Sequence, residues 1–444
     1  MRPLGALVRD LQPATPPTNV LLGRMSASPQ QPEVSVAPPV GRGFLRRTFQ
    51  AFHYRNFRLM WSGAFTSTTG SFVQEVAQSW LVYQLTDDPF LLGLTVFLNN
   101  APILLFSLLG GVAADRMDRR KLLIASQIIQ MAAALTLAVL IYTGNIAIWH
   151  ILLAAFFTGI GQAFGGPAYQ AIIPSLVDKN DLPNAIALMS IQFNLAQVVG
   201  RAIGGVAYAA VGPALCFAIN GFSFLAVSGS LLLLPCTYVP SKTQTHVFLS
   251  LKEGLNFVFS NKSMFSLVLL AVATAFLGVP IMTLLPVFAR DVYGLGPEGY
   301  ATLAATFGAG AVCGALAVAW LGNHPRKGLR ALLMQISLGL ATFAFGFAGN
   351  IYIAAVLLFI TGASVLSVFT SVNSLVQLLA PENMRGRIMS VYNTAFRGSM
   401  ALGPLAAGAL AKTQGASLTV AIYGAVLVAV AVIFLIKNQH VREL

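Results

Sequence analysis

Charged residues are scarce in this chain of 444 residues, since only 9% are Asp, Glu, Lys or Arg whereas 56% are hydrophobic. Soluble domains carry roughly 25% charged residues. A soluble fold of this length could not bury so much apolar surface, but a lipid bilayer can accept it. The scarcity of charge therefore argues against a soluble globular protein and predicts a membrane protein.

Cysteine is also rare, and the motifs of several enzyme classes are missing. The three cysteines, Cys216, Cys236 and Cys313, lie in or beside apolar segments, and their spacing fits neither a disulfide framework nor a zinc site. The sequence has no Gly-x-x-x-x-Gly-Lys-[Ser/Thr] motif, which argues against ATP hydrolysis by a P-loop. No cluster of His, Asp and Glu occurs at a predicted membrane face. We therefore expect no enzymatic reaction, no cofactor, no metal and no nucleotide partner.

Long apolar segments follow one another from residue 58 onward, separated by short polar or Gly/Pro-containing stretches. A membrane-spanning helix needs ~20 mostly apolar residues. The sequence thus predicts an all-α membrane protein with twelve transmembrane helices, over 58–85, 90–113, 121–142, 146–173, 185–211, 214–236, 263–289, 298–321, 329–348, 350–379, 387–411 and 415–436.

The net charge of +13 suggests nucleic acid at first sight, but the positions of the charges indicate something else. An even number of spans places both termini on one side of the membrane. With that side taken as the cytoplasm, the cytoplasmic tails, loops and helix ends contain every Lys and Arg except Arg201, Arg290, Arg397 and Lys412. Cytoplasmic loops are enriched in Lys and Arg. The basic surplus therefore predicts an inner-membrane protein with both termini cytoplasmic and no nucleic-acid partner.

Composition also divides the chain into regions. The first part contains eight of the 22 prolines and should be disordered; Met25 is an alternative start to Met1. Gly200–Gly205 and Gly403–Gly408 resemble each other about 200 residues apart, as expected of a duplicated six-helix unit. The predicted regions are a disordered cytoplasmic tail (1–50), a six-helix bundle (51–236), an amphipathic cytoplasmic linker (237–262), a second six-helix bundle (263–437) and a cytoplasmic tail (438–444).

The strongest local motif is GGVAADRMDRRK at 110–121, after the second predicted helix. A glycine lets another helix approach closely, an aspartate can cap or pair at a helix N-terminus, and the arginines can hold a tight turn. An ordinary positive-inside loop is the alternative. We interpret the motif as a conformational latch made of Gly111, Asp115, Arg116, Arg119 and Arg120.

This motif resembles the signature loop of the major facilitator superfamily. WLVYQLTDDPFLLG (80–93), PAYQAIIPSLV (167–177) and LPNAIALMSIQFN (182–194) are similar to the macrolide-efflux and enterobactin-exporter branch. The resemblance implies two pseudo-symmetric six-helix bundles around a central cavity, and a 110–121 loop that docks near the start of the helix over 387–411. Three departures stand out. Asp118 lies at a turn where the general motif has Gly and a positive φ is expected, and Arg201 lies where exporters often have Pro. The predicted helix over 146–173 lacks the Arg that many proton-coupled relatives carry.

Three ionisable residues lie clearly within predicted spans: Glu75, Arg201 and Arg397. A charge in hydrocarbon costs several kcal/mol or more, so it must pair, face water or bind a proton. Glu75 and Arg201 lie at matched depth, and the resemblance implies that their helices lie close together. Together these points predict an ion pair in at least one state; two independent side chains facing water are the alternative. Helical spacing places Ser71 with Glu75, and Asn194 with Arg201. The candidates for a proton or substrate pathway are Glu75, Gln78, Asn194, Gln197, Arg201 and Arg397.

Together these features predict a secondary active transporter that exports amphipathic small molecules, such as a drug, siderophore or other metabolite, by alternating access coupled to protons. Its expected partners are the small-molecule substrate, protons and the lipid bilayer. Only the family resemblance favours export. A uniporter or importer of small solutes on the same fold, or a non-transporting membrane receptor or assembly partner, remains an alternative.

Overall fold

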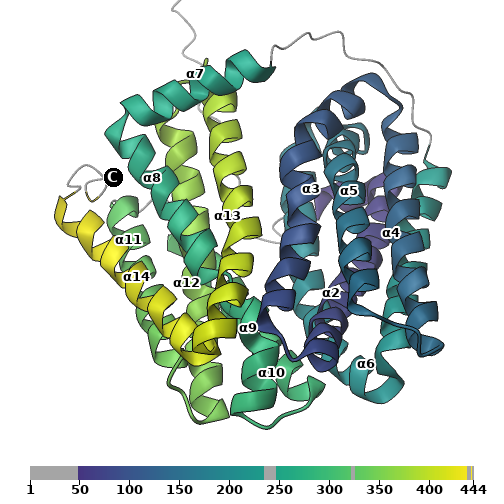
Figure 1. Ribbon diagram of the computed structural model, residues 1–444. Helices are drawn as coiled ribbons and strands as arrows, with labels where there is room; N and C mark the ends of the chain where they lie inside the picture. Colours follow the sequence, from purple (N-terminus) through teal and green to yellow (C-terminus); the bar gives the residue numbers. More distant parts are fainter. Residues whose placement is uncertain (1–48, 235–246, 322–325, 438–441, 443–444) are drawn as a thin grey trace, which may run out of the picture. The chain divides into compact units, whose positions relative to one another are not determined.

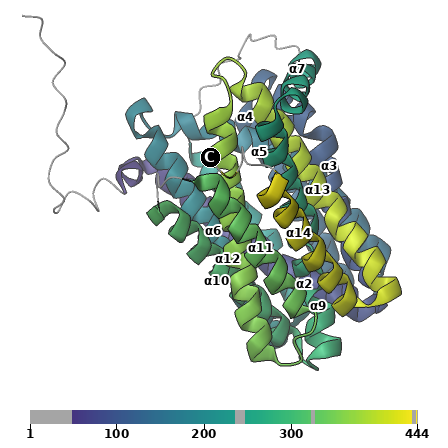
Figure 2. The same ribbon diagram turned by 90° about the vertical axis from the view of Figure 1, so that its left-hand side faces the viewer.

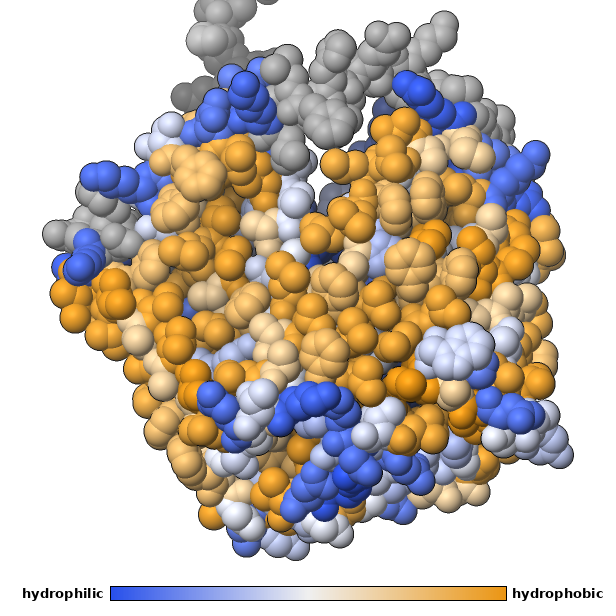
Figure 3. Space-filling model, viewed as in Figure 1, coloured by the Kyte–Doolittle hydropathy of each residue, from blue (hydrophilic) through white to orange (hydrophobic). Residues whose placement is uncertain are grey.

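The computed structural model describes residues 49–234, 247–321, 326–437 and Arg442, and within them all regular secondary structure is helical. Nine helical segments in these ranges are long and apolar enough to cross a bilayer. A broad hydrophobic belt crosses the middle of the surface, with hydrophilic residues above and below it (Figure 3). These features confirm a multi-pass, all-α membrane protein. The predictions for residues 1–48, 235–246 and 438–441 lie outside the described residues.

The N-terminal group of helices begins after a short 3₁₀ turn, η1 (Gln50–His53), and includes two further turns, η2 (Ile173–Ser175) and η3 (Lys179–Asp181). Its helices are α2 (Arg55–Thr86), α3 (Pro89–Arg116), α4 (Arg119–Tyr142), α5 (Ile148–Ile172) and α6 (Leu182–Leu233). The long α6 is two helices joined at Gly212, whose φ of 76° and ψ of 170° are not helical. Glycine adopts this backbone readily. The predicted boundary between 185–211 and 214–236 is therefore confirmed.

The C-terminal group follows the linker helix α7 (Val247–Ser260). The predicted span over 263–289 is present but irregular, because two π-helical turns, η4 and η5, interrupt it. Pro280 and Pro286 lie between these turns and lack backbone N–H donors. The elements of the group are α8 (Lys262–Ala273), η4 (Thr274–Gly278), α9 (Ile281–Val287), η5 (Phe288–Val292), α10 (Pro297–Leu321), α11 (Lys327–Phe345), α12 (Ile351–Leu379), α13 (Arg385–Gln414) and α14 (Ala416–Lys437).

Each group packs mainly within itself (Figures 1 and 2). In the first group α2 lies against α6, α3 against α5, and α4 against both α5 and α6. In the second, α12 lies against α10 and α11, and α14 against α11. The principal contacts between the groups are made by α3 with α13 and by α6 with α10. These two pairs of helices therefore determine where the groups meet.

The two ends of the helices differ in charge. We call the end that carries α7 and the turns at 117–118, 173–181 and 380–384 the basic end, and the end that carries Asp87, Asp88, Arg290 and Lys412 the far end. The groups meet toward the far end, where Gly93 of α3 touches the backbone of Pro404 in α13. The approach is so close that a Cβ atom added to Gly93 would lie only 2.3 Å from the Pro404 carbonyl oxygen.

Toward the basic end the two groups separate. Leu105 and Leu109 of α3 are 65% and 58% exposed. A Cβ atom built on Gly111 would have no neighbour within 4 Å. The surface is hollowed between the groups on this side (Figure 3). The conformation is thus closed at the far end and open at the basic end.

The linker helix α7 lies on the beginning of α13. Glu253 of α7 forms an ion pair with Arg387 of α13, and a Cβ atom built on Gly254 would lie 2.7 Å from the backbone oxygen of Arg387. Val258, one turn later, is buried. The predicted amphipathic linker therefore contains a helix that is docked on the C-terminal group.

Candidate functional site

Glu75 of α2 and Arg201 of α6 form an ion pair, with Oε1 of the carboxylate 2.9 Å from a guanidinium nitrogen. The two helices come close because glycines line α6 at this level: a Cβ atom on Gly200 would lie 2.7 Å from the backbone oxygen of Thr69. Small residues allow such backbone approach in membrane helices. The predicted pair is confirmed.

The two partners of this pair differ in exposure. Arg201 is buried, with 8% of its surface exposed, and its guanidinium carbon lies 5.1 Å from the centre of the Phe72 ring. The Glu75 side chain is 46% exposed. One turn after Arg201, Gly205 packs against α10 of the other group, where an added Cβ atom would lie 2.0 Å from the Cβ atom of Ala301. The pair therefore lies where the two groups meet, with its carboxylate still accessible.

The polar stripe predicted on α2 divides between two partners. Ser71 and Gln74 both hydrogen-bond to Asn220, in the second part of α6, at 3.3 and 2.7 Å. Gln78 accepts a bond from Gln74 at 3.4 Å. Glu75 instead faces Arg201. Most of the stripe thus satisfies its polar groups between helices, and sequence spacing did not identify Gln74 and Asn220 as the connecting residues.

The remaining candidates on α6 lie toward the basic end. Asn194 donates to the backbone oxygen of Ser190 in its own helix at 2.8 Å, and Gln197 is half-buried. The structure therefore joins Arg201 to Glu75 but does not include Asn194 in that contact.

Arg397 of α13 is exposed and has no hydrogen bond or ion pair among the described residues. Ala401, Pro404 and Gly408 follow it at helical spacing, and a Cβ atom on Gly408 would lie 2.5 Å from the backbone oxygen of Pro89. Arg397 therefore lies near the side of α13 that faces α3, next to Gly398, whose added Cβ atom would lie 3.7 Å from the Leu104 side chain. It does not join α13 to a neighbouring helix in this conformation.

The 110–121 motif makes its described contacts within the N-terminal group. Arg119 donates to the backbone oxygens of Ala114 and Ala171 at 3.2 and 3.0 Å. Arg120 donates to those of Leu232 and Leu234 at 2.9 and 3.3 Å. The arginines thus hold the ends of α3, α5 and α6 together, as expected for a tight turn.

Two expectations for this motif are wrong. Asp118 has a φ of −60° and caps α4 by accepting from the amides of Arg120 and Lys121, so the turn requires no glycine. Asp115 and Arg116 are exposed in the last turn of α3. The glycine that lets another helix approach is Gly110 and not Gly111, because a Cβ atom added to Gly110 would lie 2.1 Å from the backbone oxygen of Ala163 in α5.

A network of charges joins the groups at the far end. Arg290 of η5 pairs with Asp87 at 2.6 Å and with Asp291 at 2.8 Å, and its guanidinium lies over the Tyr83 ring. Lys412 of α13 pairs with Asp88 at 2.6 Å. The sequence predicted that Asp87, Arg290 and Lys412 share one side; their pairing depends on chain packing that spacing alone does not reveal.

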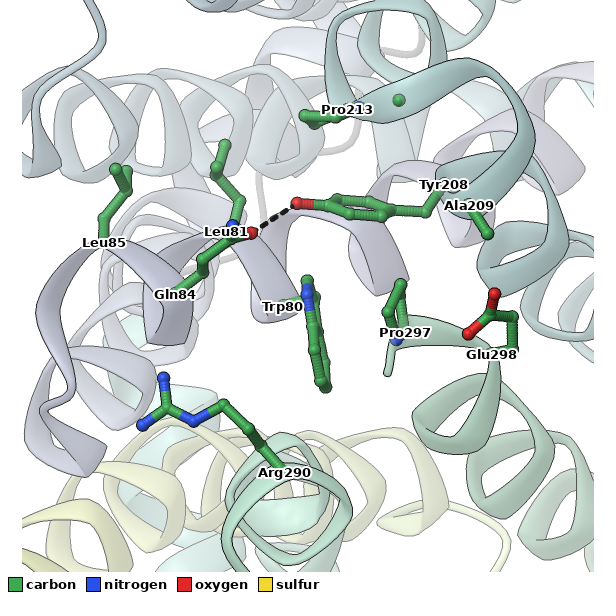
Figure 4. A pocket seen from close by; sticks show the side chains of 11 residues that line it. Trp80, Leu81, Gln84, Leu85, Tyr208, Ala209, Pro213, Arg290, Pro297 and Glu298 are labelled. Atoms are coloured by element: carbon green, nitrogen blue, oxygen red, sulfur yellow. Dashed lines mark hydrogen bonds between the residues drawn. The ribbon is translucent and has the colours of Figure 1, made fainter. Parts of the chain in front are cut away.

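A cavity of about 820 Å³ lies between the groups near the far end (Figure 4). Trp80 lies in its wall and is 8% exposed. The Tyr208 hydroxyl donates to Gln84 at 2.8 Å on one wall. Arg290 and Glu298 line its other sides. Trp80 stacks on Tyr300 of α10, with ring centres 6.3 Å apart.

Residues 47–443 match the sequence profile of the transmembrane secretion effector family. The chain belongs to this family, within the major facilitator superfamily. It is therefore a membrane transporter and not an enzyme.

Several efflux proteins are similar over most of the chain. Macrolide efflux protein A of Streptococcus pyogenes is 22% identical over 404 residues, covering 88% of this chain and 98% of that protein. The multidrug efflux pump Tap of Mycolicibacterium fortuitum is 24% identical, covering 79% and 88%. The enterobactin exporter of Escherichia coli is 25% identical, covering 87% and 93%.

Solved structures support the same fold. A POT family transporter superposes with a TM-score of 0.72 at 13% identity, covering 89% of this chain and 99% of that one. A bacterial homologue of the human lysosomal transporter Spinster, in an inward-facing conformation, superposes with a TM-score of 0.67 at 17% identity, covering 87% and 98%. The major facilitator fold is thereby supported independently of the sequence profile.

Proposed function

We propose that this protein is a proton-coupled exporter of amphipathic small molecules that works by alternating access, with twelve spans in two pseudo-symmetric six-helix bundles. The nine apolar segments become twelve when α6 is divided at Gly212 and when α2 and α13 are included. The polar residues of α2 and α13, among them Glu75 and Arg397, explain why these two helices are less hydrophobic.

The Glu75–Arg201 pair is the observation that carries this proposal. A buried guanidinium depends on its carboxylate partner, because each charge alone is unfavourable in a low-dielectric environment. Protonation of Glu75 would remove that partner and release Arg201. Since Gly205, one turn after Arg201, packs against Ala301 of the other group, a change in this pair would affect the contact between the groups. Proton binding and conformational change would then be coupled.

Charge distribution supports a cytoplasmic basic end, because Lys and Arg are enriched in cytoplasmic loops. In that orientation the present conformation is open to the cytoplasm, in the inner membrane, with both termini inside. The partly exposed Glu75 and the unpaired Arg397 would be available to a substrate entering from that side. The efflux proteins that resemble this chain favour export as the direction.

The test is substrate accumulation in cells with and without the protein, across a chemically varied library, with the proton gradient collapsed by an uncoupler while ATP is maintained. We expect accumulation to rise to the level of cells without the protein when the gradient collapses. The Glu75→Gln variant should show the same high accumulation without the uncoupler. Export against a gradient that persists after the collapse would overturn proton coupling.

A further inference from the structure

The cavity near the far end has the size and walls of a binding site. Its volume of about 820 Å³ lies within the range of ≈ 300–1,000 Å³ typical of small-molecule sites. Trp80 and Tyr208 supply aromatic surface, and Gln84 supplies a polar group on the same wall (Figure 4). Leu85 and Glu298 line it and are exposed, so a ligand can enter from the surface. This cavity is separate from the Glu75–Arg201 pair.

The charges around the cavity favour a cation. Arg290 is the basic residue in its lining, and its guanidinium is already engaged by Asp87 and Asp291. The Glu298 carboxylate lines the opposite side and forms no hydrogen bond or ion pair with the described residues. One positive charge is thus set against three carboxylates. The local field is therefore negative, and Glu298 is available to a ligand.

Aromatic walls strengthen that preference. The face of an indole or phenol ring attracts cations through its quadrupole, and tryptophan is the strongest of the aromatic side chains in this respect. Trp80 lines the cavity between Arg290 and Glu298 (Figure 4), with 8% of its surface exposed. A molecule with an apolar body and a positive charge could contact the ring and approach Glu298 at the same time.

We propose that this cavity is a second ligand site, which binds lipophilic organic cations with Glu298 as the counter-ion and Trp80 as the aromatic contact. The site is lined by α2 and α6 of the N-terminal group and by η5 and α10 of the C-terminal group. It therefore exists as described in the conformation that is closed at the far end.

Binding of radiolabelled tetraphenylphosphonium to the purified full-length protein, measured by equilibrium dialysis, tests this site. We expect saturable binding that Glu298→Gln weakens at least tenfold, with partial recovery in Glu298→Asp. Glu382→Gln is the matched control, because Glu382 is an exposed glutamate in the turn at the basic end. Tetraphenylborate, of similar shape and opposite charge, should not compete.

Two outcomes would overturn the proposal. One is equal affinity of the wild type and Glu298→Gln, and the other is binding that is abolished by Glu75→Gln but not by Glu298→Gln, which would place the cation in the pathway between the groups. Trp80→Phe, which keeps an aromatic ring, should weaken binding by a smaller factor than Glu298→Gln. Because dialysis requires no transport, a failure here is distinguishable from a failure of proton-coupled export.

Discussion

Single residues show how a buried charge is accommodated in this protein. Arg201 occupies a position in α6 at which a charge would be unfavourable without a partner. Gly200 and Gly204 on the same helix allow α2 to approach, and Glu75 then lies within ion-pair distance. Because Arg201 is buried and the Glu75 side chain is half exposed, loss of the carboxylate should be more harmful than loss of the guanidinium.

The first prediction therefore concerns the two single variants and their combination. Glu75→Gln should lower the thermal stability of the purified protein more than Arg201→Gln does, since it leaves an unpaired charge in the buried position. The double variant should be more stable than the sum of the single losses implies, with a coupling energy of about 1 kcal/mol or more. Thermal unfolding in detergent measures this. Losses that simply add would contradict a functional pair.

The sequence could predict the Glu75–Arg201 pair because both residues are rare charges at equal depth and the family resemblance implies that their helices are neighbours. It could not predict the roles of Gly110 and Asp118. Adjacent glycines at 110 and 111 lie on different sides of α3, and only the packing of α5 shows which one is covered. Asp115 and Asp118 are both near the start of α4, and only the backbone angles show which one caps it.

Among the elements, α3 and α13 form the contact that holds the far end closed. Gly93 packs against the backbone of Pro404, and Gly408 against that of Pro89. At both positions the backbones of the two helices touch, so there is no room for a side chain in place of either glycine. Because α3 and α13 touch at the far end and separate toward the basic end, a small increase in side-chain volume at these contacts should alter the conformation.

The second prediction is that Gly93→Ala shifts the protein away from the present conformation. Its Cβ atom would lie 2.3 Å from the backbone oxygen of Pro404, so α3 and α13 must move apart at the far end. Spin labels at Leu109 and Thr394, on the separated parts of these helices, should then move closer together. Gly229→Ala is the control, since its Cβ atom would meet nothing within 4 Å. An unchanged distance distribution in Gly93→Ala would refute this role.

Element boundaries were largely accessible from sequence, whereas irregularities were not. The break at Gly212 follows from a glycine before a proline in an apolar stretch. The π turn η4 lies in a continuous apolar segment and η5 at its charged end, and in neither place does hydropathy or length reveal a change of helix type. The position of α7 on α13 depends on the Glu253–Arg387 contact, which joins residues more than a hundred positions apart.

For the whole molecule, the assignment of the two ends to the two sides of the membrane is the main expectation. The third prediction is that an impermeant thiol reagent added to intact cells labels a cysteine introduced at residue 87 but not one at residue 118. Asp87 lies at the far end and Asp118 at the basic end, and both are in turns between helices. The starting protein must first have its three native cysteines replaced. Labelling of 118 alone would reverse the orientation.

Asp88 uses its two carboxylate oxygens for different purposes. Oδ1 accepts from the amide of Phe90 and so caps α3, whereas Oδ2 pairs with Lys412 across the groups. The cap lies within one group and need not break when the far end opens. It would keep the carboxylate in one rotamer, so that little side-chain entropy is lost when Lys412 returns. Under the proposed alternating access, a far-end contact built in this way would re-form with little further ordering of the Asp88 side chain.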